Sequence, residues 1–250
     1  VLINGEPAKI ENTLDAISKG IGMVHQHFML VPSLTVAENV VLGIEPMKNG
    51  LFDFEKAVSM TQEVADKYNF NIDPKMKVAD LSVGQMQKVE IMKVLIKGAK
   101  IIIMDEPTAV LTPQETDELF EQLILLRDGG HSIIFISHKL EEVKRICSRV
   151  TVLRHGYCLG SYDLADMNEE DISRLMVGRD VVLKIEKDDP KIGKPVVHIQ
   201  NLVKINESGK HVLDDISFDI HEGEVVGIAG VEGNGQSALS DVLSGMGSFT

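Results

Sequence analysis

The stretch Ile101-Ile102-Ile103-Met104-Asp105-Glu106 decides the fold class of this 250-residue chain. A continuous apolar run of this length is typical of a strand buried on both faces, as in parallel sheets. Ile133-Ile134-Phe135-Ile136 repeats the pattern and ends at Ser137-His138. Helical periodicity covers residues 53–69, 85–97, 114–127 and 140–146. This alternation of strands and helices predicts an α/β fold, with a parallel sheet flanked by helices.

Composition excludes several classes of protein. The chain is 44% hydrophobic and 25% charged, which is ordinary for a globular protein. Its formal net charge of −13 argues against nucleic acid as a partner. No apolar run reaches the roughly 18–20 residues that cross a bilayer. Cys147 and Cys158 do not form a metal-binding or redox motif, so two free thiols are expected.

A charged segment rich in helix breakers, residues 184–195, predicts a linker between two domains. The first domain would cover residues 1–183, with a helical part at about residues 45–98, and the second would cover residues 196–250. Strands are expected in the second domain at Val196–Leu202, Ile216–Ile220 and Val225–Ala229. Because the chain opens within an apparent strand and closes after an apolar helical segment, we expect an interior fragment of a longer protein.

A glycine-rich loop, Gly230-Val231-Glu232-Gly233-Asn234-Gly235-Gln236-Ser237, follows the third of these expected strands. Glycines let successive backbone N–H groups point inward, and the following helix adds its positive end, which predicts a phosphate-binding loop. Ser237 stands where a hydroxyl can ligate Mg²⁺, and Gln236 stands where such loops have lysine. An uncharged amide would hold phosphate less tightly, so slower turnover is expected here. The alternatives are a glycine turn that only caps a helix and, less well matched in spacing, a dinucleotide-binding loop.

Two carboxylates follow the first buried strand. Asp105 can make a water-mediated contact with Mg²⁺, and Glu106 can orient or polarise an attacking water. His138, at the end of the second strand, can contact a γ-phosphate and the same water. A single histidine at a strand end is more often structural, so this assignment depends on the other residues.

Two further segments carry weaker signals. Leu81-Ser82-Val83-Gly84-Gln85 begins a helix and presents a hydroxyl, free N–H groups and a helix dipole to an anion. Taken alone, it is also an ordinary helix start. Gln26 can add an amide oxygen to a Mg²⁺ shell, whereas the flanking His25 and His27 lack a third metal ligand at a useful spacing.

Each of these segments alone is weak evidence for a protein family, but their order along the chain is specific. Gln26, then LSVGQ, then an apolar strand with Asp-Glu, then an apolar strand with Ser-His is similar to the order in ATP-binding-cassette (ABC) ATPases. The resemblance extends over nearly the whole chain. It implies a P-loop NTPase core with a helical signature subdomain, followed by the antiparallel β start of a second cassette.

Three features resemble the tandem cassettes of the carbohydrate-uptake class: Met176–Asp180, Thr112-Pro113, and the glutamine-bearing loop. The run from His25 to Leu30 is more similar to nucleoside importers than to sugar importers. The resemblance therefore implies an ATP-hydrolysing subunit for nucleoside or simple-sugar import, peripheral on the cytoplasmic face of the membrane. Expected partners are permease subunits, an extracytoplasmic solute-binding protein and the second cassette. The alternatives are a soluble tandem cassette acting on ribosomes or DNA, and a cassette that binds nucleotide without turnover.

The resemblance also implies roles for individual residues, with ATP and Mg²⁺ as ligands. Catalytic roles are expected for Glu106, His138 and Gln26, and Mg²⁺ coordination for Asp105, Gln26 and Ser237. Nucleotide binding is expected for Gly230, Glu232, Gly233, Asn234, Gly235, Gln236 and Ser237, and for Ser82, Gly84 and Gln85. The signature residues should face the 230–237 loop across a cassette pair, and residues 26–43 should contact a permease helix. The isolated chain should show no ATPase activity.

Overall fold

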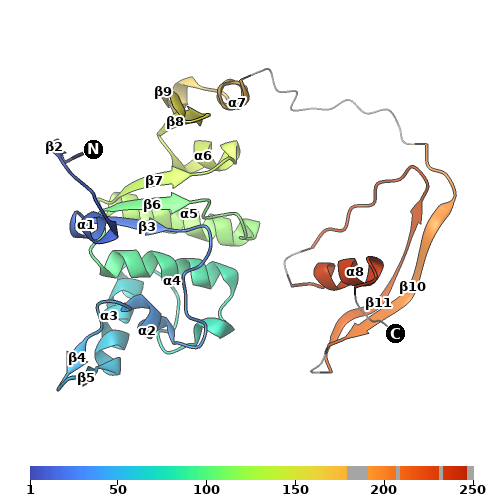
Figure 1. Ribbon diagram of the computed structural model, residues 1–250, viewed down its shortest axis with the longest axis horizontal. Helices are drawn as coiled ribbons and strands as arrows, with labels where there is room; N and C mark the ends of the chain where they lie inside the picture. Colours follow the sequence, from blue (N-terminus) through green and yellow to red (C-terminus); the bar gives the residue numbers. More distant parts are fainter. Residues whose placement is uncertain (179–190, 207–208, 231–232, 247–250) are drawn as a thin grey trace. The chain divides into compact units, whose positions relative to one another are not determined.

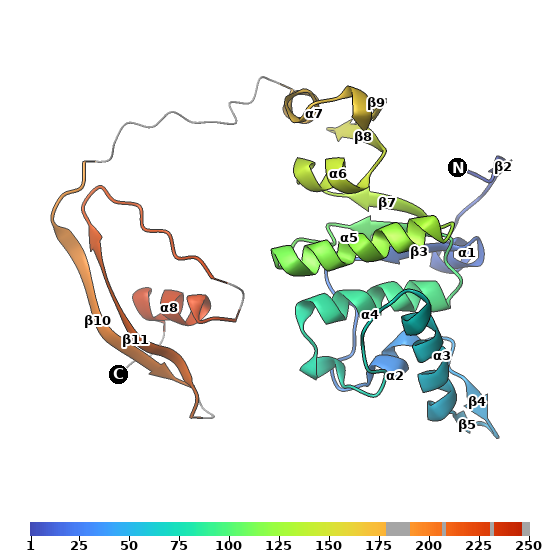
Figure 2. The same ribbon diagram turned by 180° about the vertical axis from the view of Figure 1, so that it is seen from behind.

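The computed structural model describes residues 1–178, 191–206, 209–230 and 233–246. The chain forms two compact units, Val1–Val181 and Val182–Thr250 (Figures 1 and 2). Most of the expected linker at 184–195 lies outside the described residues. The assignment of the two units to a first and a second cassette stays a prediction.

A three-stranded parallel sheet forms the centre of the first unit, with β6 (Ile101–Asp105) between β3 (Ile21–Val24) and β7 (Ser132–Ile136). The parallel sheet expected from the apolar runs is confirmed. Ile102 and Met104 are fully buried, whereas Ile134 on β7 is 50% exposed. The expectation that both runs are buried on both faces is therefore wrong for the described residues. Alternating burial along the strands shows that one face of this sheet carries the core and the other is more open.

Two long helices pack against the sheet and complete the core, α4 (Val83–Ile96) and α5 (Pro113–Asp128). Both lie alongside the strands (Figure 2). Each begins at a capping box, in which a Ser or Thr and a Gln or Glu three residues later bond each other's backbone N–H. The principal apolar cluster joins helix and strand residues, including Val24, Ile102, Met104, Val89, Met92, Phe120 and Leu123.

A smaller helical layer precedes α4. It contains α2 (Val36–Val40), the short hairpin β4 (Met47–Lys48) and β5 (Leu51–Phe52), α3 (Phe54–Lys67) and a 3-10 turn at Val78–Asp80. Thr35 and Glu38 form the capping box that begins α2, as the sequence predicts. The expected helices at 53–69 and 85–97 are confirmed, with ends displaced by one or two residues.

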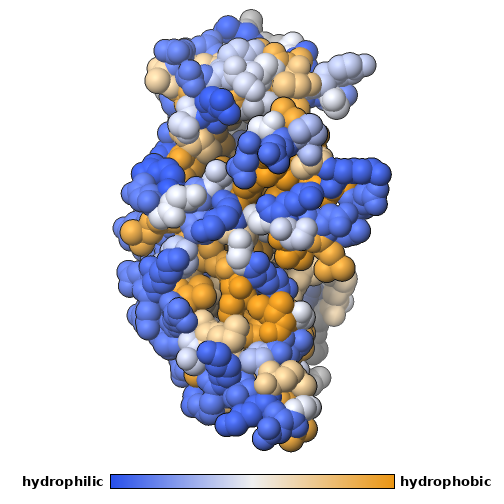
Figure 3. All heavy atoms as spheres, turned by 90° about the vertical axis from the view of Figure 1, so that its left-hand side faces the viewer, coloured by the Kyte–Doolittle hydropathy of each residue, from blue (hydrophilic) through white to orange (hydrophobic). Residues whose placement is uncertain are grey.

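The remaining elements of the first unit come from the beginning and the end of its sequence. The N-terminal elements are β1 (Leu2–Ile3), β2 (Glu6–Pro7) and α1 (Thr13–Ser18). At the other end are α6 (Leu140–Ile146), β8 (Arg149–Arg154), β9 (Tyr157–Asp163), a 3-10 turn at Leu164–Asp166 and α7 (Glu169–Val177). The β8–β9 pair is antiparallel and separate from the central sheet. Apolar groups reach the surface between hydrophilic side chains on the side shown in Figure 3.

The second unit contains an antiparallel hairpin, β10 (Pro195–Ile205) and β11 (His211–His221), and the helix α8 (Gln236–Leu243). Leu202, Leu213, Leu239 and Val242 form its apolar cluster. The expected antiparallel start is confirmed, but the strand expected at Val225–Ala229 is not formed. This segment has no ladder partner among the described residues, and Val225 is 98% exposed, so neither hydrogen bonds nor packing hold it as a strand. No helix in the described ranges combines the length and the apolar character needed to cross a membrane.

Candidate functional site

The carboxyl end of β6 presents two acidic residues in different backbone conformations. Asp105 is the last strand residue and pairs in register with Ile136 of β7. Glu106 follows with φ of 48°, in the left-handed region that residues with side chains rarely adopt. Its N–H donates to the Ile136 carbonyl at 3.0 Å, and its own carbonyl accepts from Ala109 at 3.1 Å. Strained backbone held by surrounding bonds is often found at functional sites.

Glu106 and His138 are brought together, as the resemblance implies. Glu106 Oε1 lies 2.8 Å from His138 Nδ1, and the histidine side chain is mostly exposed. Glu106 Oε2 is buried and has no hydrogen-bond partner among the described residues. A buried carboxylate oxygen without a partner is an acceptor available to a water or hydroxyl donor. The pair can therefore orient a nucleophilic water beside an imidazole that contacts solvent.

Gln26 and Asp105 lie at the same edge of the sheet. Val24 of β3 is in register with Met104 of β6, and Gln26 and Asp105 follow these two residues. Among the described residues, no three His, Cys, Asp or Glu side chains are grouped to hold a metal ion. Carboxylate and amide oxygens are donors that Mg²⁺ accepts, and Mg²⁺ commonly takes its other ligands from phosphate and water. The donor set therefore fits a magnesium ion that arrives with a nucleotide.

The N-terminus of α4 carries an interaction that sequence reasoning missed. Ser82 caps the helix, and its Oγ accepts from Gln85 N at 3.2 Å. The Gly84 N–H donates to Glu115 Oε1 at 3.0 Å, and the Ser82 hydroxyl lies 3.4 Å from the same oxygen. A Cβ on Gly84 would lie 2.6 Å from Glu115 Oε1, so only glycine allows this approach. Glu115 was detectable in the sequence only as the capping-box residue of the next helix.

Hydrogen bonds dominate the electrostatics of Glu115. Burial raises the pKa of this carboxyl, but hydrogen bonds from Thr112 and from Gly84 and Ser82 outweigh it and hold the pKa below its usual value. Its Oε2 accepts from both the backbone N–H and the hydroxyl of Thr112, each at 3.0 Å. One carboxylate therefore joins the N-termini of α4 and α5.

The glycine-rich loop lies in the second unit. Gly233 and Gly235 have φ of 89° and 101°, which favour glycine, and Gly235 precedes α8 without a side-chain cap. A helix start of this kind can present backbone N–H groups to an anion. Gly230, Asn234 and Ser237 are exposed and Gln236 is half-buried, whereas Glu232 lies outside the described residues.

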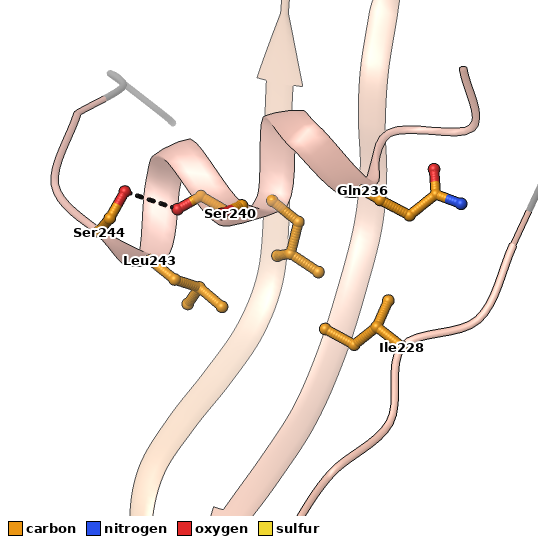
Figure 4. Close-up of a pocket in the computed structure, with 6 residues that line it drawn as sticks. Ile228, Gln236, Ser240, Leu243 and Ser244 are labelled. Carbon is orange, nitrogen blue, oxygen red and sulfur yellow. Dashed lines mark hydrogen bonds between the residues drawn. The ribbon is translucent and has the colours of Figure 1, made fainter. Parts of the chain in front are cut away.

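A pocket adjoins this loop. It is lined by Ile228, Gln236, Leu239, Ser240, Leu243 and Ser244 (Figure 4). Ile228 belongs to the segment expected as a strand, and it lies opposite α8 across the pocket. The lining is mainly apolar, so the pocket lies beside the expected phosphate loop and is not itself an anion site.

Known proteins match this chain over nearly its whole length. Residues 1–109 match the family described as ABC transporter. The guanosine import ATP-binding protein NupO of Bacillus subtilis is 46% identical over 98% of this chain and 48% of its own length. The nucleoside import ATP-binding protein NupA of Lactococcus lactis subsp. cremoris is 40% identical over 98% of this chain and 49% of its length. The glucose import ATP-binding protein TsgD13 of Haloferax volcanii is 42% identical, with shares of 98% and 50%.

Solved structures agree on the fold. A nucleotide-free ATP-binding cassette from an ABC transporter superposes with a TM-score of 0.55 at 22% identity, covering 67% of this chain and 68% of that one. The cbiO1 protein of Clostridium perfringens gives a TM-score of 0.55 at 23% identity, covering 70% and 68%. The chain spans about half the length of the relatives named above. Residues 1–109 therefore match the ABC transporter family, and the fold is that of an ATP-binding cassette.

Proposed function

We propose that this chain is part of an ATP-hydrolysing subunit that powers the import of nucleosides or simple sugars. The observation that carries the proposal is the pairing of Glu106 Oε1 with His138 Nδ1 at 2.8 Å, beside Asp105 at the edge of the sheet. The names of the relatives support the transport role, because they describe nucleoside and sugar import ATP-binding proteins. NupO and the run from His25 to Leu30 favour a nucleoside as the solute.

The proposed reaction is in-line attack of water on the γ-phosphate of ATP. Glu106 would accept a hydrogen bond from this water through Oε2 and hold it in line, while Oε1 keeps His138 in place. His138 would face the γ-phosphate through Nε2, and Gln26 would contact the γ-phosphate or its Mg²⁺. When bound, Mg²⁺ would neutralise phosphate charge, with Asp105 and Gln26 as its nearest protein donors. The phosphate loop serving this site would belong to a part of the protein beyond this chain.

A second nucleotide would bind to the Gly230–Ser237 loop and to a signature segment. Ser82, Gly84 and Gln85 would contact nucleotide through the Ser82 hydroxyl and the helix N-terminus. Phosphate would there replace Glu115 Oε1 as the acceptor for the Gly84 N–H and Ser82 Oγ as the acceptor for the Gln85 N–H. Gln236 replaces the usual lysine, and an amide provides a weaker hydrogen bond to phosphate than an ammonium. Binding without efficient turnover is therefore proposed for this second site.

The proposed partners follow from the transport role. They are permease subunits that contact residues 26–43, an extracytoplasmic solute-binding protein, and the second cassette of the same protein. The subunit would lie at the cytoplasmic face of the membrane. ATP-driven closure of the cassettes would move the permease, and hydrolysis would reopen them.

The test is Glu106→Gln in the complete protein with both cassettes. This change keeps the side-chain size and the contact with His138 but removes the charge, so ATP turnover should fall at least about 100-fold. ATP binding, measured with a fluorescent analogue, should remain. Glu141→Gln, at an exposed position on α6, is the matched control. Parental turnover in Glu106→Gln would remove Glu106 from the catalytic role.

A further inference from the structure

On α4, an ion pair between the buried Glu90 and the partly buried Lys93 holds the backbone of a residue 61 positions before Glu90. Glu90 is 4% exposed, and its Oε1 accepts from the Met29 N–H at 2.5 Å. Its Oε2 lies 3.1 Å from Lys93 Nζ, and the same Nζ donates to the Met29 carbonyl at 2.7 Å. The pair therefore binds both polar groups of one peptide residue. We call Glu90, Lys93 and the Met29 backbone the Met29 clamp.

Helix stability does not require this arrangement. An i,i+3 pair on an exposed helix face contributes little to stability, whereas a buried carboxylate is costly unless every oxygen is bound. The Met29 side chain is itself 65% exposed, so the clamp fixes backbone and not a core side chain. Asn39 on α2 holds Val31 in the same way, accepting from its N–H at 2.8 Å and donating to its carbonyl at 3.1 Å. Residues 29–31 are therefore bound on two sides.

The position of the clamp connects two parts of the expected machinery. Met29 is three residues after Gln26, within the segment expected to contact a permease. Glu90 is five residues after Gln85 on the continuous helix α4, which is capped by Ser82. A displacement of the Gln26 segment must therefore move α4 with it or break charge-assisted bonds in a buried site.

We propose that the Met29 clamp couples the Gln26 segment to the signature helix, with Glu90 and Lys93 as positioning residues. The inference rests on the proposed function, because it assigns the clamp a role in transmitting permease movement to Ser82 and Gly84. Neither Glu90 nor Lys93 contacts Glu106 or His138 in the described hydrogen bonds. Loss of the clamp should reduce coupling while the chemistry at Glu106 is retained.

The experiment uses the double variant Glu90→Gln, Lys93→Met in the complete protein, with and without its permease subunits in lipid vesicles. Both replacements are close in size to the originals, and uncharged replacements of buried pairs are often tolerated. We expect permease stimulation of ATPase activity to fall about fivefold, with the unstimulated rate within about twofold of the parent. The control is Lys88→Met, Glu118→Gln, which removes a 2.7 Å ion pair between α4 and α5 and should retain stimulation.

Hydrogen exchange provides an independent measurement. Peptides covering residues 27–34 should exchange faster in the double variant, whereas peptides from β6 should match the parent. Lys93→Arg keeps the positive charge but changes the shape of the side chain, and it should retain most of the permease stimulation. This result would show that the charge of residue 93, and not its packing alone, is required. Full stimulation in the double variant, or unchanged exchange over 27–34, overturns the inference. Absence of ATPase activity in the parent overturns the proposed function instead, and the exchange result then decides whether the clamp holds this segment.

Discussion

Glu115 provides a quantitative test of how the two helices beside the sheet are joined. Replacing it with alanine removes the capping box of α5, which contributes about 1 kcal/mol. It also removes the charged acceptor for the Gly84 N–H and the weaker Ser82 contact, and it leaves a buried N–H unpaired. Charge-assisted bonds contribute about 1.5–3 kcal/mol when fully formed, but partial solvent exposure reduces this share to about 1 kcal/mol. The expected total is therefore about 2 kcal/mol.

Hydrogen exchange on the purified chain at pH 7 can measure this local loss. A change of 2 kcal/mol corresponds to roughly 30-fold faster exchange, expected in peptides that contain residues 83–88 and 112–118. Glu115→Gln keeps an acceptor without the charge and should show a smaller effect. Glu121→Ala, at an exposed position on the same helix, is the control. An increase confined to the α5 peptide would refute the joining of α4 and α5 by Glu115.

The same residue predicts a pH dependence. The folded-state pKa of Glu115 lies below its ordinary value because hydrogen bonds from Thr112, Gly84 and Ser82 outweigh burial. Its stabilising contribution is therefore complete above the ordinary glutamate pKa and is lost as the pH falls through the lowered pKa. The difference in urea midpoint between the parent and Glu115→Ala should be present at pH 7 and should shrink in acid.

Three further predictions concern other parts of the chain. Phe120→Ala removes a buried ring in edge contact with Phe135 and should destabilise the first unit by about 3–5 kcal/mol in urea unfolding. Gly235→Ala places a Cβ 2.8 Å from the Val212 carbonyl at a φ of 101°, so exchange in α8 should accelerate by at least about tenfold. Burial and then the charge of Lys100 lower the pKa of His131, so the folded chain favours the neutral imidazole. The free energy of unfolding should therefore decrease as the pH falls below about 6.5, and His131→Gln should weaken this pH dependence.

Local rules predicted most of the helices and the central strands. The capping boxes at Thr35 and Ser82 connect residues three apart, so their partners are visible in a short window of sequence. The apolar runs that became β6 and β7 are continuous and end at polar residues, which identifies parallel strands. The strand expected at Val225–Ala229 failed because a strand requires a neighbour, and the described part of its unit offers none in register.

The sequence by itself determined the parallel α/β core, the helix starts and the order of chemical groups, because these depend on periodicity and on caps within a few residues. Tertiary structure alone decided which of those groups meet. Glu106 reaches His138 across 32 positions, Glu115 reaches Gly84 across 31, and Glu90 reaches Met29 across 61. Spacing along the chain does not encode such contacts, since they form only after packing has brought strand ends and helix faces together.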